Sequence, residues 1–386
     1  MRTRRSSTPA PARPDERRAP RYRLVRAAAT AVLTASALTA SSLTATAGAA
    51  AQASLEADGA ARPGANSPVA YRETVADLEA TVRFYHDVLG MEIAGRPGKW
   101  RTDREESVLT GKRVWSRTVD ITVPNESFVL RFTQYRGIRQ VQRQAGGADP
   151  GQMQLTLSVK NAPAAYAALR AAHTPTLNKG GTIPDGSGTG TITVWVRDPD
   201  GMPVEVVQRS GPDDWFTVDP PTVTDGPGMK YVIRGQIDWV VKSDEVSLKF
   251  YRGLLDFDID PGFEPLIGPG EHVAMPDFLA DMFGIAHGST WAAATGNCAA
   301  EVRCEYFEYD DPARKDFQPA PTDPGAPSFE VSSSNLPTLV GRLKEAGVTI
   351  VTPGGRPVLV HGTPTILVRD YSGLLVRLVQ VGHQAR

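Results

Sequence analysis

The sequence predicts an α+β protein in which one strand–helix–strand unit occurs four times. Two long blocks are separated by segments rich in Gly, Pro and Ala. Each block opens with an extended apolar segment that runs into an amphipathic helix, and the same order returns in the second half of each block. Helices that alternate with strands in this way cover one face of a sheet, so we expect curved mixed sheets with helices on one side.

The first block, 68–209, opens with a strand over Val69–Val75 and a helix that begins after Asp77. Asp77 suits a helix N-cap because its short side chain can accept hydrogen bonds from free backbone N–H groups. Apolar residues then recur at helical spacing, at Leu78, Val82, Tyr85 and Leu89. The second unit of this block has a strand, a helix and two more strands, predicted at Gln154–Val159, Pro163–Ala172, Thr191–Val196 and Val204–Val207.

The second block, 231–382, repeats this order. It opens with a strand over Gly235–Val241, and Ser243 stands where the following helix needs an N-cap. Its later strands and helix are predicted at Ser328–Val331, Leu336–Ala346, Thr365–Val368 and Leu375–Leu378. One apolar segment, Pro276–Gly284, is an insertion that we expect to form a short helix over the sheet.

The N-terminal region, 1–53, has the layout of a secretory signal peptide. Met1–Arg26 is basic, Ala27–Ala50 is uncharged, and small residues suited to cleavage follow. A retained anchor helix is the alternative, because the uncharged stretch is long enough to span a bilayer. We expect a secreted or extracytoplasmic protein without stable membrane association after cleavage, with a flexible lead-in at 54–67 and a linker between the blocks at 210–230.

Charge and cysteine content restrict the partners and the environment. The formal net charge is -1, so electrostatics does not point to nucleic acid. The two cysteines are Cys298 and Cys304. An extended strand would hold them too far apart for a disulfide unless a turn intervenes, so a disulfide and a pair of free thiols both stay open.

Two motifs carry a resemblance to a known family. The first block has Asp77 followed by Phe84-Tyr85 and Leu89-Gly90, and the turn Asp198-Pro199-Asp200-Gly201 that leads to Glu205; the second has Phe250-Tyr251, Leu255 and the altered turn Asp370-Tyr371-Ser372-Gly373. Together they resemble the vicinal-oxygen-chelate (VOC) superfamily, which includes glyoxalase I, extradiol dioxygenases and bleomycin-resistance proteins. The resemblance implies tandem VOC domains built from paired βαβββ modules. We expect the aromatic pairs, Phe84-Tyr85 and Phe250-Tyr251, to pack between helix and sheet.

The resemblance also implies where metal ligands would stand. It implies that the front half of one domain builds a cup with the back half of the other. One crossed cup then holds two amides and two carboxylates, at Gln154, Glu205, Gln236 and Glu305. The other would hold residues that cannot bind a cation, at Ala70, Arg131, Ser328 and Arg377. We therefore predict one candidate metal site and one degenerate cup.

An all-oxygen ligand set suits hard ions such as Mg, Mn or Ca. Zn or Ni members of the family usually have His where Gln154 stands, which is a departure here. His272, in a loop of the second block, is predicted to be a solvated loop residue rather than an extra ligand or base. An extradiol dioxygenase is disfavoured because a two-His, one-carboxylate set cannot be assembled.

Three functions remain open at this point. The resemblance favours a divalent-metal-dependent lyase or isomerase acting on a small oxygenated substrate, with Glu205 or Glu305 moving the proton. The alternative is a resistance-type protein that binds a small molecule without metal or catalysis. The third is a structural or surface protein that kept only the fold, in which the polar residues only make one face of the sheet hydrophilic, as strand alternation alone would. The expected partner is a small molecule, and the oligomeric state is left open.

Overall fold

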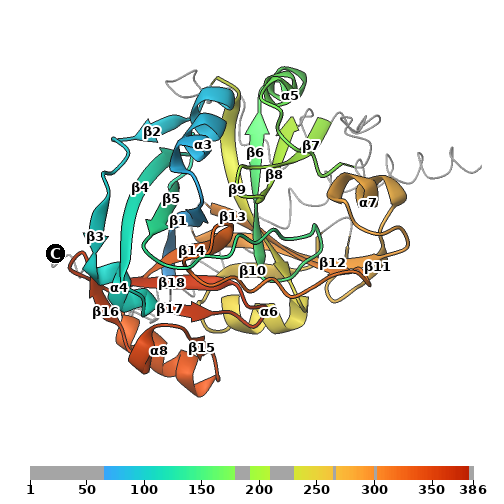
Figure 1. Ribbon diagram of the computed structural model, residues 1–386. Helices are drawn as coiled ribbons and strands as arrows, with labels where there is room; N and C mark the ends of the chain where they lie inside the picture. The colour runs from blue at the N-terminus through green and yellow to red at the C-terminus, as the bar shows by residue number, and fades with distance from the viewer. Residues whose placement is uncertain (1–64, 179–191, 209–229, 264–266, 300–301, 382–386) are drawn as a thin grey trace, which may run out of the picture. The chain divides into compact units, whose positions relative to one another are not determined.

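The computed structural model describes residues 65–178, 192–208, 230–263, 267–299 and 302–381 (Figure 1). The chain divides into two units, Met1–Ala57 and Asp58–Arg386, and the described residues belong to the second. The predicted signal peptide lies outside the described residues, as do nearly all of the lead-in and the linker. None of the described helices is long and apolar enough to cross a membrane.

A ten-stranded sheet joins the beginning of the first block to the end of the second. Its strands run in the order β15-β17-β18-β14-β1-β5-β4-β2, with β16 beside β17 and β3 beside β4. The first-block strands are β1 (Ala65–Val75), β2 (Glu92–Ala94), β3 (Arg101–Asp103), β4 (Val114–Thr122) and β5 (Val129–Arg136). The second-block strands are β14 (Ala326–Ser333), β15 (Thr349–Ile350), β16 (Val358–Val360), β17 (Thr363–Arg369) and β18 (Leu375–Gln380).

An eight-stranded sheet makes the reciprocal combination, in the order β10-β12-β13-β9-β6-β8-β7 with β11 beside β12. The first-block strands are β6 (Gln152–Val159), β7 (Ile192–Arg197) and β8 (Pro203–Gln208). The second-block strands are β9 (Val232–Val241), β10 (Asp258–Pro261), β11 (Val273–Ala274), β12 (Thr290–Ala299) and β13 (Val302–Asp310). Each sheet therefore contains half of each block, and the predicted crossed pairing is confirmed.

Two antiparallel pairings hold the halves together. Strand β1 pairs with β14, and β6 pairs with β9. On either side of each junction the strands run parallel, β1 with β5 and β14 with β18 in one sheet, β9 with β13 and β6 with β8 in the other. The sheets are thus mixed, as the α+β prediction requires, and that prediction is confirmed.

Helices follow the strands at the predicted places. They are α3 (Leu78–Val82, continued by a wider turn at Arg83–Val88), α4 (Arg104–Thr110), α5 (Ala162–Ala171), α6 (Asp244–Tyr251), α7 (Asp277–Phe283) and α8 (Leu336–Glu345), with a short turn at Pro353–Gly355. Asp77 and Ser243 cap their helices as predicted, by accepting from the backbone N–H groups of Glu79 and Val246. Helix α4 was not predicted, because its sequence shows no clear helical periodicity.

One face of each sheet packs against helices in a shared hydrophobic core. Phe84, Tyr85, Phe250 and Tyr251 are all buried there, as expected for residues between helix and sheet. Trp239 stacks on Tyr306 at 4.8 Å between ring centroids. The opposite face of each strand, which alternation points the other way, carries the polar residues considered next.

The β12–β13 hairpin resolves the state of the two cysteines. The strands are antiparallel, with Gly296 opposite Cys304, so the chain reverses between Cys298 and Cys304. Their Cα atoms are 5.9 Å apart and their sulfurs are joined. The pair therefore forms a disulfide rather than two free thiols.

Candidate functional site

The eight-stranded sheet brings the four predicted ligands onto one face. Asp238 of β9 lies opposite Gln154 of β6 and beside Glu305 of β13. Thr156 lies opposite Gln236 and beside Glu205 of β8. Because neighbouring strands are about 4.8 Å apart, the four predicted residues surround a central pair, Asp238 and Thr156. We call this polar face the acidic cup.

Thr156 connects two carboxylates at the centre of the acidic cup. Its hydroxyl lies 2.7 Å from Asp238 Oδ2 and 2.8 Å from Glu205 Oε2. The second oxygen of Glu205 accepts from the Thr193 hydroxyl at 2.7 Å. A hydroxyl has one hydrogen to donate. The single hydrogen of Thr156 thus serves two carboxylates.

The two predicted amides differ in what they contact. Gln236 is 5% exposed and donates from Nε2 to Asp238 Oδ1 at 2.6 Å. Gln154 is 2% exposed, and its Nε2 lies 3.4 Å from the carbonyl oxygen of Gly147. The carbonyl oxygen of the Gln154 side chain has no hydrogen-bond partner among the described residues. Buried polar atoms are rarely left without one, so this oxygen indicates a place for a further donor.

Aromatic side chains border the acidic cup. Trp195 of β7, opposite Glu205, meets the ring of Phe283 of α7 edge-on at 5.2 Å, and Phe283 lies 6.0 Å from the ring of Tyr309. Burial, and then the charges of Asp238, Glu305 and Glu205, raise the pKa of Tyr309 well above its ordinary value. Helix α7 thus places an apolar roof against this face. The predicted insertion helix is confirmed as a helix.

The donors of the acidic cup are hard oxygens, which would suit Mg, Mn or Ca. Within the described part of the chain, however, no group of three or more His, Cys, Asp or Glu side chains is placed so that it could hold a metal ion. The central Thr156–Asp238 hydrogen bond stands between the four predicted ligands. The metal site stays a prediction, and no chemical step is derived through it.

His272 lies away from this face. Its ring is 3.8 Å from Glu308, whose side chain alternates to the other side of β13 from Glu305, and it is half exposed. The expectation that His272 is a solvated loop residue agrees with this position.

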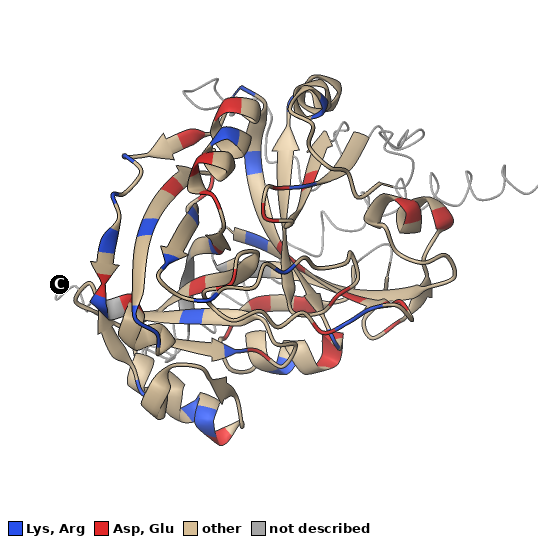
Figure 2. Ribbon diagram, viewed as in Figure 1, with Lys and Arg blue, Asp and Glu red and all other residues tan. Residues whose placement is uncertain are grey.

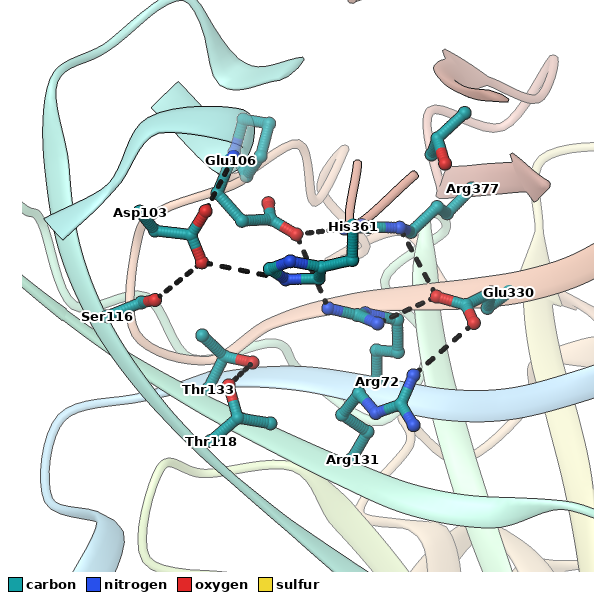
Figure 3. A network of polar contacts seen from close by, with 12 residues as sticks. Arg72, Asp103, Glu106, Ser116, Thr118, Arg131, Thr133, Glu330, His361 and Arg377 are labelled. Carbon is teal, nitrogen blue, oxygen red and sulfur yellow. Dashed lines mark hydrogen bonds and ion pairs between the residues drawn. The ribbon is translucent and has the colours of Figure 1, made fainter. Parts of the chain in front are cut away.

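The ten-stranded sheet has at its equivalent positions a network of ion pairs (Figure 3). Arg72 Nη1 lies 2.7 Å from Glu330 Oε2, and Arg377 Nη1 lies 2.6 Å from Glu106 Oε1. Arg131 binds Asp120 with two hydrogen bonds. Figure 2 shows both basic and acidic residues on the strands of this sheet. Predicted Arg131 and Arg377 are thus part of the network, whereas Ala70 contributes no charge.

Helix α4 completes this network by inserting Glu106 from outside the sheet. Glu106 is 5% exposed and also accepts from the Tyr135 hydroxyl at 3.3 Å. Burial alone would raise the pKa of its carboxyl, but Arg377 and Arg72 outweigh burial and lower it. Positive and negative groups are matched here within the chain itself.

A small cavity lies beside the network, lined by Arg72, Arg377, Glu106, Thr133 and Ser328 among others. Its volume of about 30 Å³ is enough for one or two water molecules. Because the charges around it are already paired, we interpret it as a hydrated gap rather than as a ligand site.

The first block is similar in sequence to a known protein family. The family model described as "Glyoxalase/Bleomycin resistance protein/Dioxygenase superfamily" matches residues 71–206. The match lies within the first block of the chain. The resemblance inferred from the motifs is therefore confirmed, and so is the fold class of tandem VOC domains.

Solved structures of superfamily proteins are similar to this chain at low identity. Glyoxalase I from Zea mays is 15% identical with a TM-score of 0.47, covering 81% of this chain and 92% of that one. A glyoxalase family protein from Bacillus cereus is 12% identical with a TM-score of 0.33, covering 40% of this chain and 99% of that one. No curated protein matches the sequence.

Two central residues of the acidic cup, Asp238 and Thr156, were missed by sequence reasoning. Each stands two positions from a predicted residue, Asp238 after Gln236 and Thr156 after Gln154, so strand alternation places both on the same face. That signal was available, but the family ligand positions alone did not include them.

Proposed function

We propose that this protein is exported and binds a small molecule on the acidic cup without needing a metal. The observation that carries the proposal is the buried side-chain oxygen of Gln154, to which no described residue donates a hydrogen bond. It lies beside carboxylates that share a donor and beneath an aromatic border. Ligand sites typically combine an apolar lining with a few convergent polar groups of this kind.

Two further points support this proposal. The superfamily resemblance implies small-molecule ligands, and the second cup is occupied by its own ion pairs, which leaves the acidic cup as the candidate. The Cys298–Cys304 disulfide supports export, because disulfides persist in oxidising compartments. The signal-peptide layout at 1–53 is the reason to expect cleavage.

A fragment screen tests the site. The chain from Ser54 onward is screened by ligand-observed NMR against neutral, anionic and cationic aromatic fragments. We expect hits whose binding is lost in Gln154→Leu and kept in Ser328→Ala, which changes the equivalent position of the other sheet. If no hit distinguishes these two variants, the acidic cup is not the binding site.

A metal-dependent lyase or isomerase is the second candidate, favoured by the hard-oxygen donors alone. In that case Glu205 or Glu305 would hold the transferred proton. Calorimetric titration with Mg, Mn, Ca, Zn and Ni, for wild type and Glu205→Ala, separates the two candidates. Binding that depends on Glu205 would favour the enzyme, and absence of binding would leave the metal-free proposal.

A further inference from the structure

The backbone carbonyl of Gly147 orients two glutamine side chains of β6. Nε2 of Gln152 lies 3.3 Å from this oxygen, and Nε2 of Gln154 lies 3.4 Å from it. A carbonyl oxygen attracts the N–H side of an amide and repels its oxygen, so the oxygen of each side chain is turned away from Gly147. The two glutamines are two positions apart on one strand, so both belong to the face that forms the acidic cup.

The oxygens of these two glutamines form a pair of acceptors. Gln152 is 0% exposed and Gln154 is 2% exposed. No described residue donates a hydrogen bond to the side-chain oxygen of either. Because buried polar atoms are rarely left unpaired, a molecule that binds beside them has to bring hydrogen-bond donors.

The indole N–H of Trp195 is a donor that is also left over. Trp195 is 3% exposed, and its Nε1 has no acceptor in the described part of the chain. Trp195 stands opposite Glu205, so its side chain lies on the same face of the sheet as the acidic cup. An indole nitrogen can only donate. The same molecule therefore has to bring an acceptor as well.

Phe283 of α7 brings this donor and these acceptors to one place. Its ring meets the ring of Trp195 edge-on at 5.2 Å. Its backbone is so close to Gly147 that a Cβ on this glycine would lie 2.1 Å from the Phe283 carbonyl oxygen. Phe283 thus contacts Trp195 through its ring, and through its backbone it contacts the glycine that orients both glutamines. An aromatic ring in this position packs well against a flat ligand.

A ligand that satisfies this set carries donors and an acceptor together. An amidinium cation has donors alone and leaves Trp195 unpaired. A carboxylate has acceptors alone and leaves the oxygens of Gln152 and Gln154 unpaired. A primary carboxamide has two N–H hydrogens and a carbonyl oxygen, which match the two acceptors and the donor of the acidic cup.

Resting on the proposed function, we infer that the ligand of the acidic cup is an uncharged flat molecule with an amide group, such as an aromatic carboxamide. Its N–H groups are donated to Gln152 and Gln154, and its carbonyl oxygen accepts from Trp195. Its ring packs against Phe283.

Four probes of nearly the same size separate these contributions. Benzamide has N–H donors and a carbonyl, acetophenone has the carbonyl alone, benzamidinium has donors alone and benzoate has acceptors alone. Calorimetry on the chain from Ser54 onward should show benzamide binding at least about tenfold more tightly than each of the other three. The reason is that each of them leaves at least one buried group unpaired.

Variants assign the preference to its two sides. Gln154→Met keeps the length of the side chain without its amide and should bring the ratio of benzamide to acetophenone affinity toward one. Gln152→Met serves the same purpose if Gln154→Met does not fold. Trp195→Phe keeps a ring without the N–H, so it should weaken both probes by about tenfold and leave their ratio unchanged. Trp115→Phe, the matched change at a tryptophan of the other sheet that is 38% exposed, should alter neither affinity.

Three outcomes would overturn the inference. Benzamide that binds no more tightly than acetophenone, benzamidinium or benzoate would reject the amide ligand. A preference for benzamide that survives both Gln154→Met and Trp195→Phe would also reject it, because the amide would then bind elsewhere. No binding of benzamide would reject it too. In each case fragment hits lost in Gln154→Leu would still support the small-molecule site, and only their absence would remove the proposed function.

Discussion

Asp238 and Arg72 occupy the same position in the two sheets but carry opposite charges. Asp238 stands opposite Gln154 and beside Glu305, and Arg72 stands opposite Ser328 and beside Arg131. The charge at this position, negative at Asp238 and positive at Arg72, determines which side chains can pair with it in each cup. Around Arg72 the chain supplies the carboxylates of Glu106 and Glu330, whereas Asp238 accepts from Thr156 and Gln236.

Thr156→Val should destabilise the protein by about 1–3 kcal/mol, because two carboxylates lose the hydroxyl that they share. Thr193→Val is the matched control, since Thr193 donates to Glu205 alone. We expect it to cost less, as Glu205 is only half-buried. Urea unfolding measures both; equal costs would show that the shared hydroxyl has no special role.

Glu106→Gln should lower the free energy of unfolding by about 3–5 kcal/mol, because it leaves the buried Arg377 and Arg72 without one of their carboxylates. The same change at Glu245, which pairs with Lys249 on the exposed face of α6, should have little effect. Chemical unfolding of the two variants checks the difference. A small effect of Glu106→Gln would mean that solvent reaches the network.

Glu73, on the face of β1 opposite Arg72, makes stability depend on pH. Burial, then Asp198 and Asp200, raise its pKa well above the ordinary value. Burial and Asp198 likewise raise the pKa of Asp200 to about 7. The folded state then holds protons that the unfolded state has released, so stability should fall as pH rises above about 4.5, by up to about 1.4 kcal/mol per pH unit for each group.

Glu73→Gln removes one of these groups and should therefore gain stability relative to wild type as pH increases. Urea unfolding at pH 5, 7 and 8.5 measures the difference. Asp87→Asn, the same kind of acid-to-amide change on an exposed side chain, is the control. A stability difference that stays constant across the three pH values would contradict the assignment.

Reduction of the Cys298–Cys304 disulfide should cost about 2 kcal/mol, the size expected when a short loop loses its cross-link. Cys298→Ser together with Cys304→Ser should show the same loss without reductant. Thermal unfolding with and without dithiothreitol compares the two. A wild type that is insensitive to reductant would show that the bond does not form in solution.

Much of the fold could be predicted from local patterns, and much of the site could not. Asp77 and Ser243 predict where their helices begin, and the motifs around Tyr85 and Tyr251 indicate the family. The neighbours of Gln154 could not be predicted in this way, because strand register determines that it lies opposite Asp238 rather than Gln236. Glu106 was missed because it lies in a short helix without a strong sequence pattern. Its partner, Arg377, is 271 positions away in the sequence.

The exchange of halves between the sheets has a consequence for how the molecule can be divided. Neither block closes a sheet by itself, since β1 and β6 each need a strand from the other block. A block expressed alone would expose two unpaired strand edges, which are templates for association with another chain. The two blocks thus pair with each other as two subunits of a dimer would, but within one polypeptide. We therefore expect the two repeats to fold and unfold together.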